Sequence, residues 1–256
     1  MLWLVWFVFK LSRRLWLLLA AAAAGFAAGL LLQARAEQRS WAVVRADAER
    51  QLVGDDLIPA ADTVDTRSLR IEAPPEQVWP WIVQMGWGRG GWYSYDKMDM
   101  DRPSAQTILD EFQSLSPGET VPMYPEGGFE ARVVEPPTAL VLYLDTELVR
   151  AQAAAAEDGR TADGAATPGT PKGLEAVGAM SELTMPDFRV SWAFVLEPAA
   201  GGGTRLIERL RLWTAPSGVA QRLGMPFVGL GVFLMTRKHM LGLKERVERH
   251  APTEEV

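Results

Sequence analysis

An uncharged hydrophobic run near the N-terminus is the strongest constraint on how this chain folds. The run covers residues 15–32 and contains only Leu, Ala, Gly, Trp and Phe. As a helix rising about 1.5 Å per residue it would be roughly 27 Å long, close to the thickness of a bilayer core. It lacks the polar face that a helix packed on a protein core normally has. We therefore predict an N-terminal membrane anchor over 1–36, with one transmembrane helix at about 15–32.

The charges around this run predict the side of the membrane on which the rest of the chain lies. Lys10, Arg13 and Arg14 precede the run, which favours an N-terminus inside the cytoplasm. The expected localisation is the cell membrane, single-pass, with the following domain extracytoplasmic. An alternative is a cleaved signal, because 12–17 resembles a twin-arginine export motif and 34–36 resembles a small-residue cleavage site.

The composition of the remaining chain excludes several classes of function. After residue 36 it carries 22 basic against 32 acidic residues, which is unfavourable for binding nucleic acid. The chain has no cysteine, so disulfides, thiolate metal sites and cysteine nucleophiles are excluded. Its two histidines, His239 and His250, argue against a histidine-rich metal centre and against a Ser–His–Asp triad. We expect neither a metal nor another cofactor.

Hydrophobic periodicity predicts an α+β domain. A strand is expected at 67–72, followed by a short helix that begins at paired prolines and is limited by Pro80. Strands are also expected at 129–135 and 140–145. The clearest hairpin joins 188–197 to 204–214, because apolar residues alternate in both and a glycine-rich turn separates them. A long helix over about 219–249 has an apolar stripe of Gly229, Phe233, Met240, Leu243 and Val247.

These elements divide the chain into parts. Residues 37–65 are charged and mixed, and are predicted to be a linker with a short amphipathic helix. The domain is predicted to cover 66–249 and to be followed by a tail at 250–256. Within it, 151–187 is rich in Ala, Gly, Thr and Pro, which is typical of a flexible insertion.

Two motifs and the order of elements resemble a known superfamily. The segment 71–82 reads Ile-Glu-Ala-Pro-Pro-Glu-Gln-Val-Trp-Pro-Trp-Ile, and resembles the opening strand and helix of the START-like helix-grip proteins. These proteins are also called SRPBCC or polyketide cyclase/dehydrase-like. The hairpin around 191–206 and the terminal helix add to the resemblance. Residues 84–96 look like a signature of one bacterial branch of this superfamily.

The resemblance implies a curved antiparallel sheet wrapped on the long C-terminal helix, with a cavity between them. An apolar cavity with a few polar groups is a common form of small-molecule site. The alternative is that the same side chains fill an ordinary core. The expected lining residues are Trp192, Phe194, Leu210 and Leu212 from the sheet, and Phe233 and Met240 from the helix.

The segment 87–96 combines glycines with aromatic residues and one arginine. We interpret it as a loop at the mouth of the cavity, where Arg89 meets a polar ligand end and Tyr93 and Tyr95 form hydrogen bonds. The glycines permit tight turns there. The alternative is an irregular packed loop in which Arg89 pairs with a carboxylate such as Asp96.

Three residues are candidates for catalysis: Asp96, Tyr95 and Glu208. Glu208 is of particular interest because strand periodicity places it on an apolar face, where burial would suit a general acid or base. Its alternative role is a charge partner for Arg209, Arg211 or Arg89. Asp96, Asp99 and Asp101 alternate like part of a calcium loop, but the required glycine and distal glutamate are missing.

Three functions are consistent with these sequence features. The first is a membrane-anchored protein that binds a lipid or another apolar small molecule. The second is an enzyme of the cyclase, dehydratase or hydrolase kind that acts on an apolar substrate in the same cavity. The third is a module that recruits a protein partner through the insertion at 151–187. The first is preferred because no convincing pair of base and nucleophile is evident in the sequence.

Overall fold

The computed structural model describes residues 28–99, 102–125, 127–163, 187–215 and 219–250. The chain divides into two compact units, Met1–Trp41 and Ala42–Val256. The described part of the first unit is a helix over 28–40, in which Ser40 Oγ donates to the carbonyl of Ala36 at 3.0 Å. Most of the predicted transmembrane segment, 15–27, lies outside the described residues. No helix in the part of the chain that the structure describes has the length and apolar character needed to cross a membrane.

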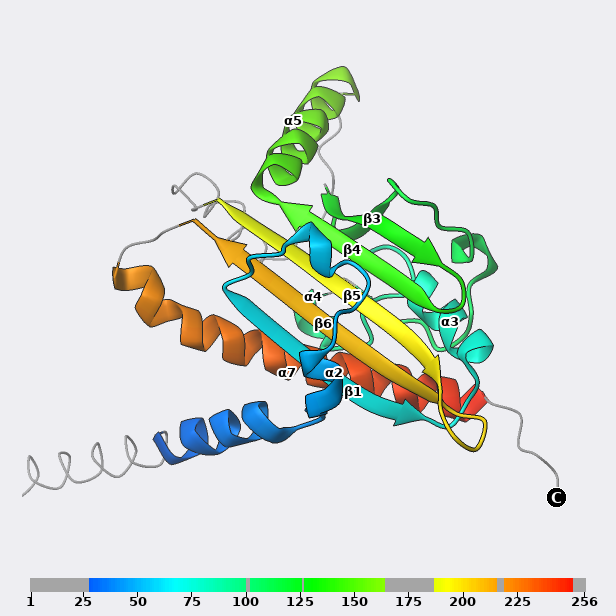
Figure 1. Ribbon diagram of the computed structural model, residues 1–256. Coiled ribbons are helices and arrows are strands. Elements are labelled where there is room, and N and C mark those ends of the chain that lie inside the picture. The colour runs from blue at the N-terminus through cyan, green and yellow to red at the C-terminus, as the bar shows by residue number, and fades with distance from the viewer. Residues whose placement is uncertain (1–27, 100–101, 126, 164–186, 216–218, 251–256) are drawn as a thin grey trace, which may run out of the picture. The chain divides into compact units, whose positions relative to one another are not determined.

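The second unit is built on a six-stranded antiparallel sheet with the order β1-β6-β5-β4-β3-β2 (Figure 1). The predicted strands and hairpin are confirmed, with shifts of a few residues at their ends. The short strand β2 is not among the predicted strands. The strands are β1 (Thr63–Ile71), β2 (Thr120–Tyr124), β3 (Gly127–Glu135), β4 (Ala139–Asp145), β5 (Phe188–Pro198) and β6 (Thr204–Thr214).

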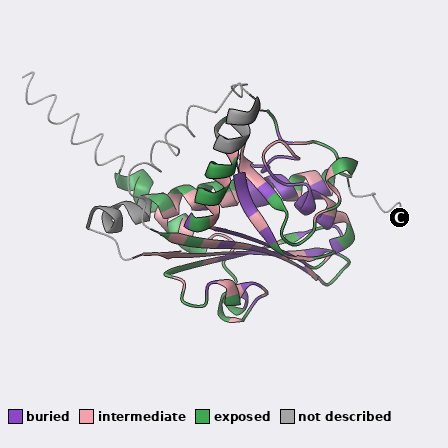
Figure 2. Ribbon diagram, turned by 90° about the horizontal axis from the view of Figure 1, so that it is seen from above, coloured by how far each residue is buried: buried purple, intermediate pink, exposed green. Residues whose placement is uncertain are grey.

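Two helices cover one face of the sheet, which we call the inner face (Figure 2). They are α3 (Pro75–Val83) and the long C-terminal helix α7 (Val219–His250). The predicted stripe of α7 is buried at four positions, with exposures of 0 to 2%: Phe233, Met240, Leu243 and Val247. The inner-face residues Phe194 and Leu206 are also fully buried. An antiparallel sheet packed against one long C-terminal helix is an α+β arrangement that fits the helix-grip fold.

The opposite, outer face of the sheet is covered by residues 42–62, which we call the N-terminal strap. The strap contains α2 (Arg45–Glu49) and the 3₁₀ turn η1 (Asp55–Leu57). Leu52 and Ile58 are buried against the sheet. At Gly54, with φ of 83°, an added Cβ would lie 2.6 Å from a methyl carbon of Val141. Glycine therefore allows close contact between the strap and β4.

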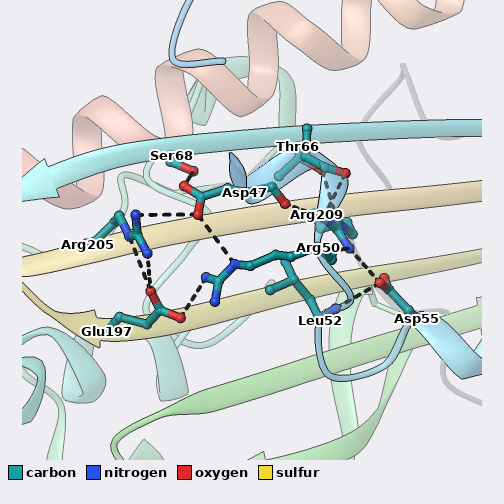
Figure 3. A network of polar contacts seen from close by, with 10 residues as sticks. Asp47, Arg50, Leu52, Asp55, Thr66, Ser68, Glu197, Arg205 and Arg209 are labelled. Atoms are coloured by element: carbon teal, nitrogen blue, oxygen red, sulfur yellow. Dashed lines mark hydrogen bonds and ion pairs between the residues drawn. The ribbon is translucent and has the colours of Figure 1, made fainter. Parts of the chain in front are cut away.

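Polar contacts to β6 hold the strap in place (Figure 3). Arg209 is 2% exposed and donates to the side chains of Asp55 and Thr66, and to strap carbonyls including those of Asp47 and Arg50. Asp47 is 1% exposed and accepts a hydrogen bond of 2.6 Å from Ser68. The segment predicted as a linker, 37–65, is thus divided: residues 42–62 belong to the compact unit, and β1 begins at Thr63. Its contacts with Arg209 join residues some 150 to 160 positions apart, so local sequence pattern gives no indication of them.

The segment predicted as an insertion also differs from expectation in its first part. Helix α5 (Thr146–Asp163) continues directly from β4 and covers the beginning of 151–187. Gln152 in this helix contacts the backbone of Gly128 in β3 through two hydrogen bonds of 3.0 and 3.1 Å. Residues 164–186 of the predicted insertion lie outside the described residues. Between β1 and β2, the chain also forms α4 (Asp96–Asp99) and the 3₁₀ turn η2 (Asp110–Phe112).

Candidate functional site

A glutamate and a histidine meet in the interior between the sheet and α7. Glu208 lies on the inner face of β6, and His239 projects from α7 toward it. His239 Nε2 is 3.2 Å from Glu208 Oε1, and the two side chains are 2% and 1% exposed, respectively. The other ring nitrogen, Nδ1, is 2.6 Å from the backbone oxygen of Trp92. The histidine ring is therefore fixed from both sides.

The contact of the His239 imidazole with Trp92 shows that one ring nitrogen carries a proton. A carbonyl oxygen only accepts, so Nδ1 of His239 carries a proton and donates it to Trp92. The other ring nitrogen, Nε2, faces the Glu208 carboxyl, whose Oε1 is 3.2 Å away.

Aromatic side chains surround this pair. Trp192 donates from its indole nitrogen to Glu208 Oε2 at 3.2 Å, and its ring stacks on Trp92 at a centroid distance of 5.7 Å. Phe194 and Tyr93 pack against the His239 ring, with centroids 5.8 and 6.2 Å away. These rings exclude water and lower the local polarity. Electrostatic interactions at the pair are therefore stronger than they would be at the surface.

A second pair of charges lies beside Glu208 on the same face. Arg67 in β1 is the direct cross-strand partner of Glu208, so both side chains point to the inner face. Arg67 is 4% exposed, and its Nη2 is 2.7 Å from Oδ1 of Asp65, which is 27% exposed. The guanidinium also lies 5.1 Å from the ring centroid of Phe233. Asp65 thus balances the charge of Arg67.

Apolar side chains adjoining this polar group are incompletely covered. The register of β5 and β6 places four of them next to one another on the inner face, and all four have intermediate burial. We call this set the inner wall: Val190, Trp192, Leu210 and Leu212. In the next two inner-face rows of the sheet, Phe194, opposite Glu208, and Leu206, opposite Leu196, are at 0% exposure. The layer between sheet and helix is thus closed at one end and accessible at the other.

The contacts of Arg89 are with other parts of the domain, and its role at a ligand stays a prediction. Arg89 donates to the backbone carbonyls of Val83 and Met85, both at 3.0 Å, and its guanidinium lies 4.7 Å from the ring centroid of Phe112. It therefore satisfies carbonyl groups at the end of α3, which have no partner within the helix. Burial lowers the pKa of Arg89. The alternative pairing of Arg89 with Asp96 is wrong, since Asp96 accepts from Ser104 instead.

Tyr93 has a structural role in the same segment. It is 1% exposed and has a φ of 54°. Its hydroxyl donates to the carbonyl of Trp81 at 2.8 Å and accepts from Gln84 at 3.0 Å. Burial raises the pKa of the Tyr93 phenol well above its ordinary value of 10.0. The neutral phenol is therefore the form that the folded protein stabilises.

This pKa shift predicts how stability depends on alkaline pH. Because the folded pKa of Tyr93 is raised, its contribution is complete below about pH 10 and declines as pH rises further, by about 1.4 kcal/mol per pH unit. Tyr93→Phe is expected to lower the free energy of unfolding by about 1–3 kcal/mol at pH 8. It should also flatten the decline above pH 10 in urea unfolding. Tyr95→Phe, at an exposed position, is the control. An equal alkaline decline in the wild type and Tyr93→Phe would contradict the prediction.

The other predicted site residues are placed apart from the Glu208–His239 pair or within the core. Tyr95 is 41% exposed, whereas Met240 and Phe233 are fully buried in the sheet–helix layer. Asp96 begins α4 and is bound to Ser104. Within the described ranges, no group of three or more His, Asp or Glu side chains could hold a metal ion.

Glu208 is predicted from the sequence as a site residue, but its predicted partners are wrong and His239 is not among the predicted site residues. Arg209 and Arg211 belong to the outer face of β6 and contact the strap. Strand alternation already implies this, because neighbouring residues in a strand point to opposite faces. His239 precedes Met240 on α7 and lies four residues before Leu243, so it borders the buried stripe. A histidine beside that stripe and a glutamate on the apolar face of β6 together form the signal that could have revealed the pair.

Comparisons with known proteins assign no family to the chain. A scan against protein-family models finds no match, and no curated protein matches. Among solved structures, the chain is similar to protein MLL2253 from Mesorhizobium loti, with 14% identity and a TM-score of 0.36 over 74% of this chain and 100% of that chain. It is also similar to a conserved protein from Geobacillus kaustophilus, with 12% identity and a TM-score of 0.39 over 73% and 96% of the two chains. CalU16 from Micromonospora echinospora has 16% identity and a TM-score of 0.27 over 73% and 84%.

These similarities concern the fold and carry no argument about activity. The class of the protein follows from its own architecture: an α+β domain in which an antiparallel sheet packs against a long C-terminal helix. What the site can do follows from the inner wall and from the Glu208–His239 pair beside it.

Proposed function

We propose that this protein binds an apolar small molecule between the inner face of its sheet and α7. The observation that carries the proposal is the inner wall, four apolar side chains that are only half-buried although they border a closed, fully buried core. Covering apolar surface contributes about 25 cal/mol per Å², so a ligand lying on this wall would gain several kcal/mol. The polar groups at its closed end would fix the orientation of the ligand.

A single substitution on the inner wall tests this proposal. Leu210→Gln places an amide on the wall and is expected to reduce a co-purifying lipophilic molecule at least about tenfold. The molecule would be measured by native mass spectrometry of the purified full chain, followed by solvent extraction. Val64→Gln is the matched control, because Val64 is 46% exposed on the outer face of the neighbouring strand. Equal ligand content in the two variants would contradict binding at the inner wall.

We further propose that the chain is tethered to the cell membrane with this domain on the extracytoplasmic side. The support is the uncharged run at 15–32 and the basic residues that precede it. Carbonate extraction of membranes and protease protection of intact spheroplasts measure the two parts of this proposal separately. Release of the chain into the soluble fraction would contradict tethering.

An enzymatic function is the second candidate, and the Glu208–His239 pair favours it. His239 is oriented by the Trp92 carbonyl and faces a carboxyl group, which is the geometry of an acid–base pair held by a third group. A cyclase or dehydratase reaction on the bound molecule would use this pair. Conversion of the co-purified molecule by the wild type, and its loss in His239→Gln with binding retained, would support catalysis. Identical conversion by both proteins would exclude a role of the pair.

A further inference from the structure

We propose that Trp92 determines which molecules bind at the inner wall, by donating its indole N–H to an oxygen atom of the ligand. The ligand is then an apolar molecule that carries a carbonyl, ether or hydroxyl oxygen, and not a pure hydrocarbon. This inference rests on the proposed function. It adds a specificity-determining residue and the chemical group that this residue recognises.

Trp92 places a hydrogen-bond donor in the interior of the domain. The residue is 6% exposed. Its Nε1 is buried and has no hydrogen-bond partner among the residues that the structure describes. A buried donor in this state is unfavourable, and nearly all buried polar groups in folded proteins have a partner. An oxygen atom supplied by a ligand would satisfy it.

This donor belongs to a ring that adjoins the inner wall. The Trp92 ring stacks on Trp192, a member of the wall, with a centroid distance of 5.7 Å and an interplanar angle of 16°. Phe129 of β3 packs edge-on against both rings, with centroid distances of 6.3 and 6.1 Å. A molecule in contact with Trp192 therefore lies beside the ring of Trp92 as well.

The two stacked indoles differ in what their N–H groups bind. Trp192 donates to Glu208 Oε2 at 3.2 Å, so its donor is already used. Trp92 is held by its backbone carbonyl, which is 2.6 Å from His239 Nδ1, and by the stacked ring. Its N–H is therefore positioned before a ligand arrives, which reduces the entropy cost of binding. An oxygen atom can accept from this N–H and a methylene group cannot, so the indole distinguishes an oxygenated molecule from a hydrocarbon of the same shape.

Two photoreactive probes of equal length test this selection. Both have a twelve-carbon chain with a mid-chain diazirine, and at one position near the end the first has a ketone carbonyl where the second has a methylene. The purified full chain is irradiated with each probe, and the labelled residues are mapped by peptide mass spectrometry. The measured quantity is the ratio of ketone to hydrocarbon labelling on β5 and β6, and its change between variants cancels the different water solubilities of the probes. We expect Trp92→Phe to lower this ratio about tenfold, because the phenyl ring preserves an aromatic contact but has no N–H.

Two further variants separate the hydrogen bond from a change in packing. Benzothienylalanine at position 92 keeps the shape of the indole and replaces only its N–H by sulfur, so it should lower the ratio as Trp92→Phe does. It decides the inference where Trp92→Phe does not fold. Trp87→Phe is the matched control, since Nε1 of Trp87 is also buried without a partner in the described part of the chain. The backbone of Trp87 binds Pro122 of β2, three strands away from β5, so the ratio should stay unchanged.

The outcomes separate the inference from the proposed function. An unchanged ratio in the folded benzothienylalanine protein would overturn the selection by Trp92 and leave apolar binding intact. An equal fall of the ratio in Trp87→Phe would overturn it too. Absence of label on β5 and β6 with both probes would overturn the proposed function itself.

Discussion

Replacing His239 by leucine is expected to lower the free energy of unfolding by about 3–5 kcal/mol. The substitution leaves the Glu208 carboxyl in an aromatic interior at 1% exposure, without the imidazole that faces it at 3.2 Å. Arg67 does not replace it, because its charge is already balanced by Asp65 at 2.7 Å. Urea unfolding followed by near-ultraviolet circular dichroism measures the loss.

The double variant His239→Leu/Glu208→Leu supplies the decisive comparison. When both members of a buried charged pair are replaced by apolar groups of similar volume, most of the loss is recovered. We expect the double variant to be more stable than His239→Leu alone. His250→Leu, an exposed position on the same helix, is the control and should change stability by less than about 1 kcal/mol. A double variant as unstable as the sum of its single changes would show that the two side chains do not form a coupled pair.

Replacing Arg209 by methionine is expected to lower the free energy of unfolding by a similar amount, about 3–5 kcal/mol, for a different reason. Methionine keeps part of the side-chain volume but leaves Asp55 with Arg211 alone as its cation, and removes the donor of several strap carbonyls. The strap itself should be destabilised in addition to the domain as a whole. Amide hydrogen exchange over residues 42–62 is expected to accelerate by at least about a hundredfold relative to β4.

Arg205→Met is the matched control for this strap prediction. Arg205 also contacts Asp47, and it pairs with Glu197, but its side chain is 42% exposed. Solvent screens exposed pairs, so this change should cost less than about 1 kcal/mol. Equal exchange rates over the strap in Arg209→Met and Arg205→Met would contradict the assignment of strap stability to the buried arginine.

The elements that can be predicted from sequence are those with a complete local signal. Alternation in β5 and β6, a glycine-rich turn and one apolar stripe on α7 are sufficient to define the hairpin and the helix. Strand β2 is five residues long and includes Pro122, so its signal is short and interrupted. Helix α5 escapes prediction because its alanine-rich sequence lacks a strong apolar face, although alanine favours helix formation.

The candidate site can be predicted only in part, because it depends on contacts between distant residues. Alternation assigns Trp192, Leu210 and Leu212 to the sheet side, and they do form the inner wall. The pairing of Glu208 with His239 joins a strand to a helix, and no local pattern specifies it. The contacts of Arg89 escape prediction because a glycine-rich aromatic segment resembles a ligand loop. Its arginine instead completes the hydrogen bonds of a short helix.

The return of β6 to β1 determines when the domain can form during synthesis. β1 and the strap leave the ribosome early, yet their partners on β6 follow about 140 to 160 residues later. Until then, β1 has an unpaired edge and the strap lacks its arginines, so most of the sheet must wait for nearly the whole chain. Such long-range pairing makes folding slow and leaves strand edges exposed to other chains. The nascent N-terminal segment therefore needs protection from aggregation for most of the time that translation takes.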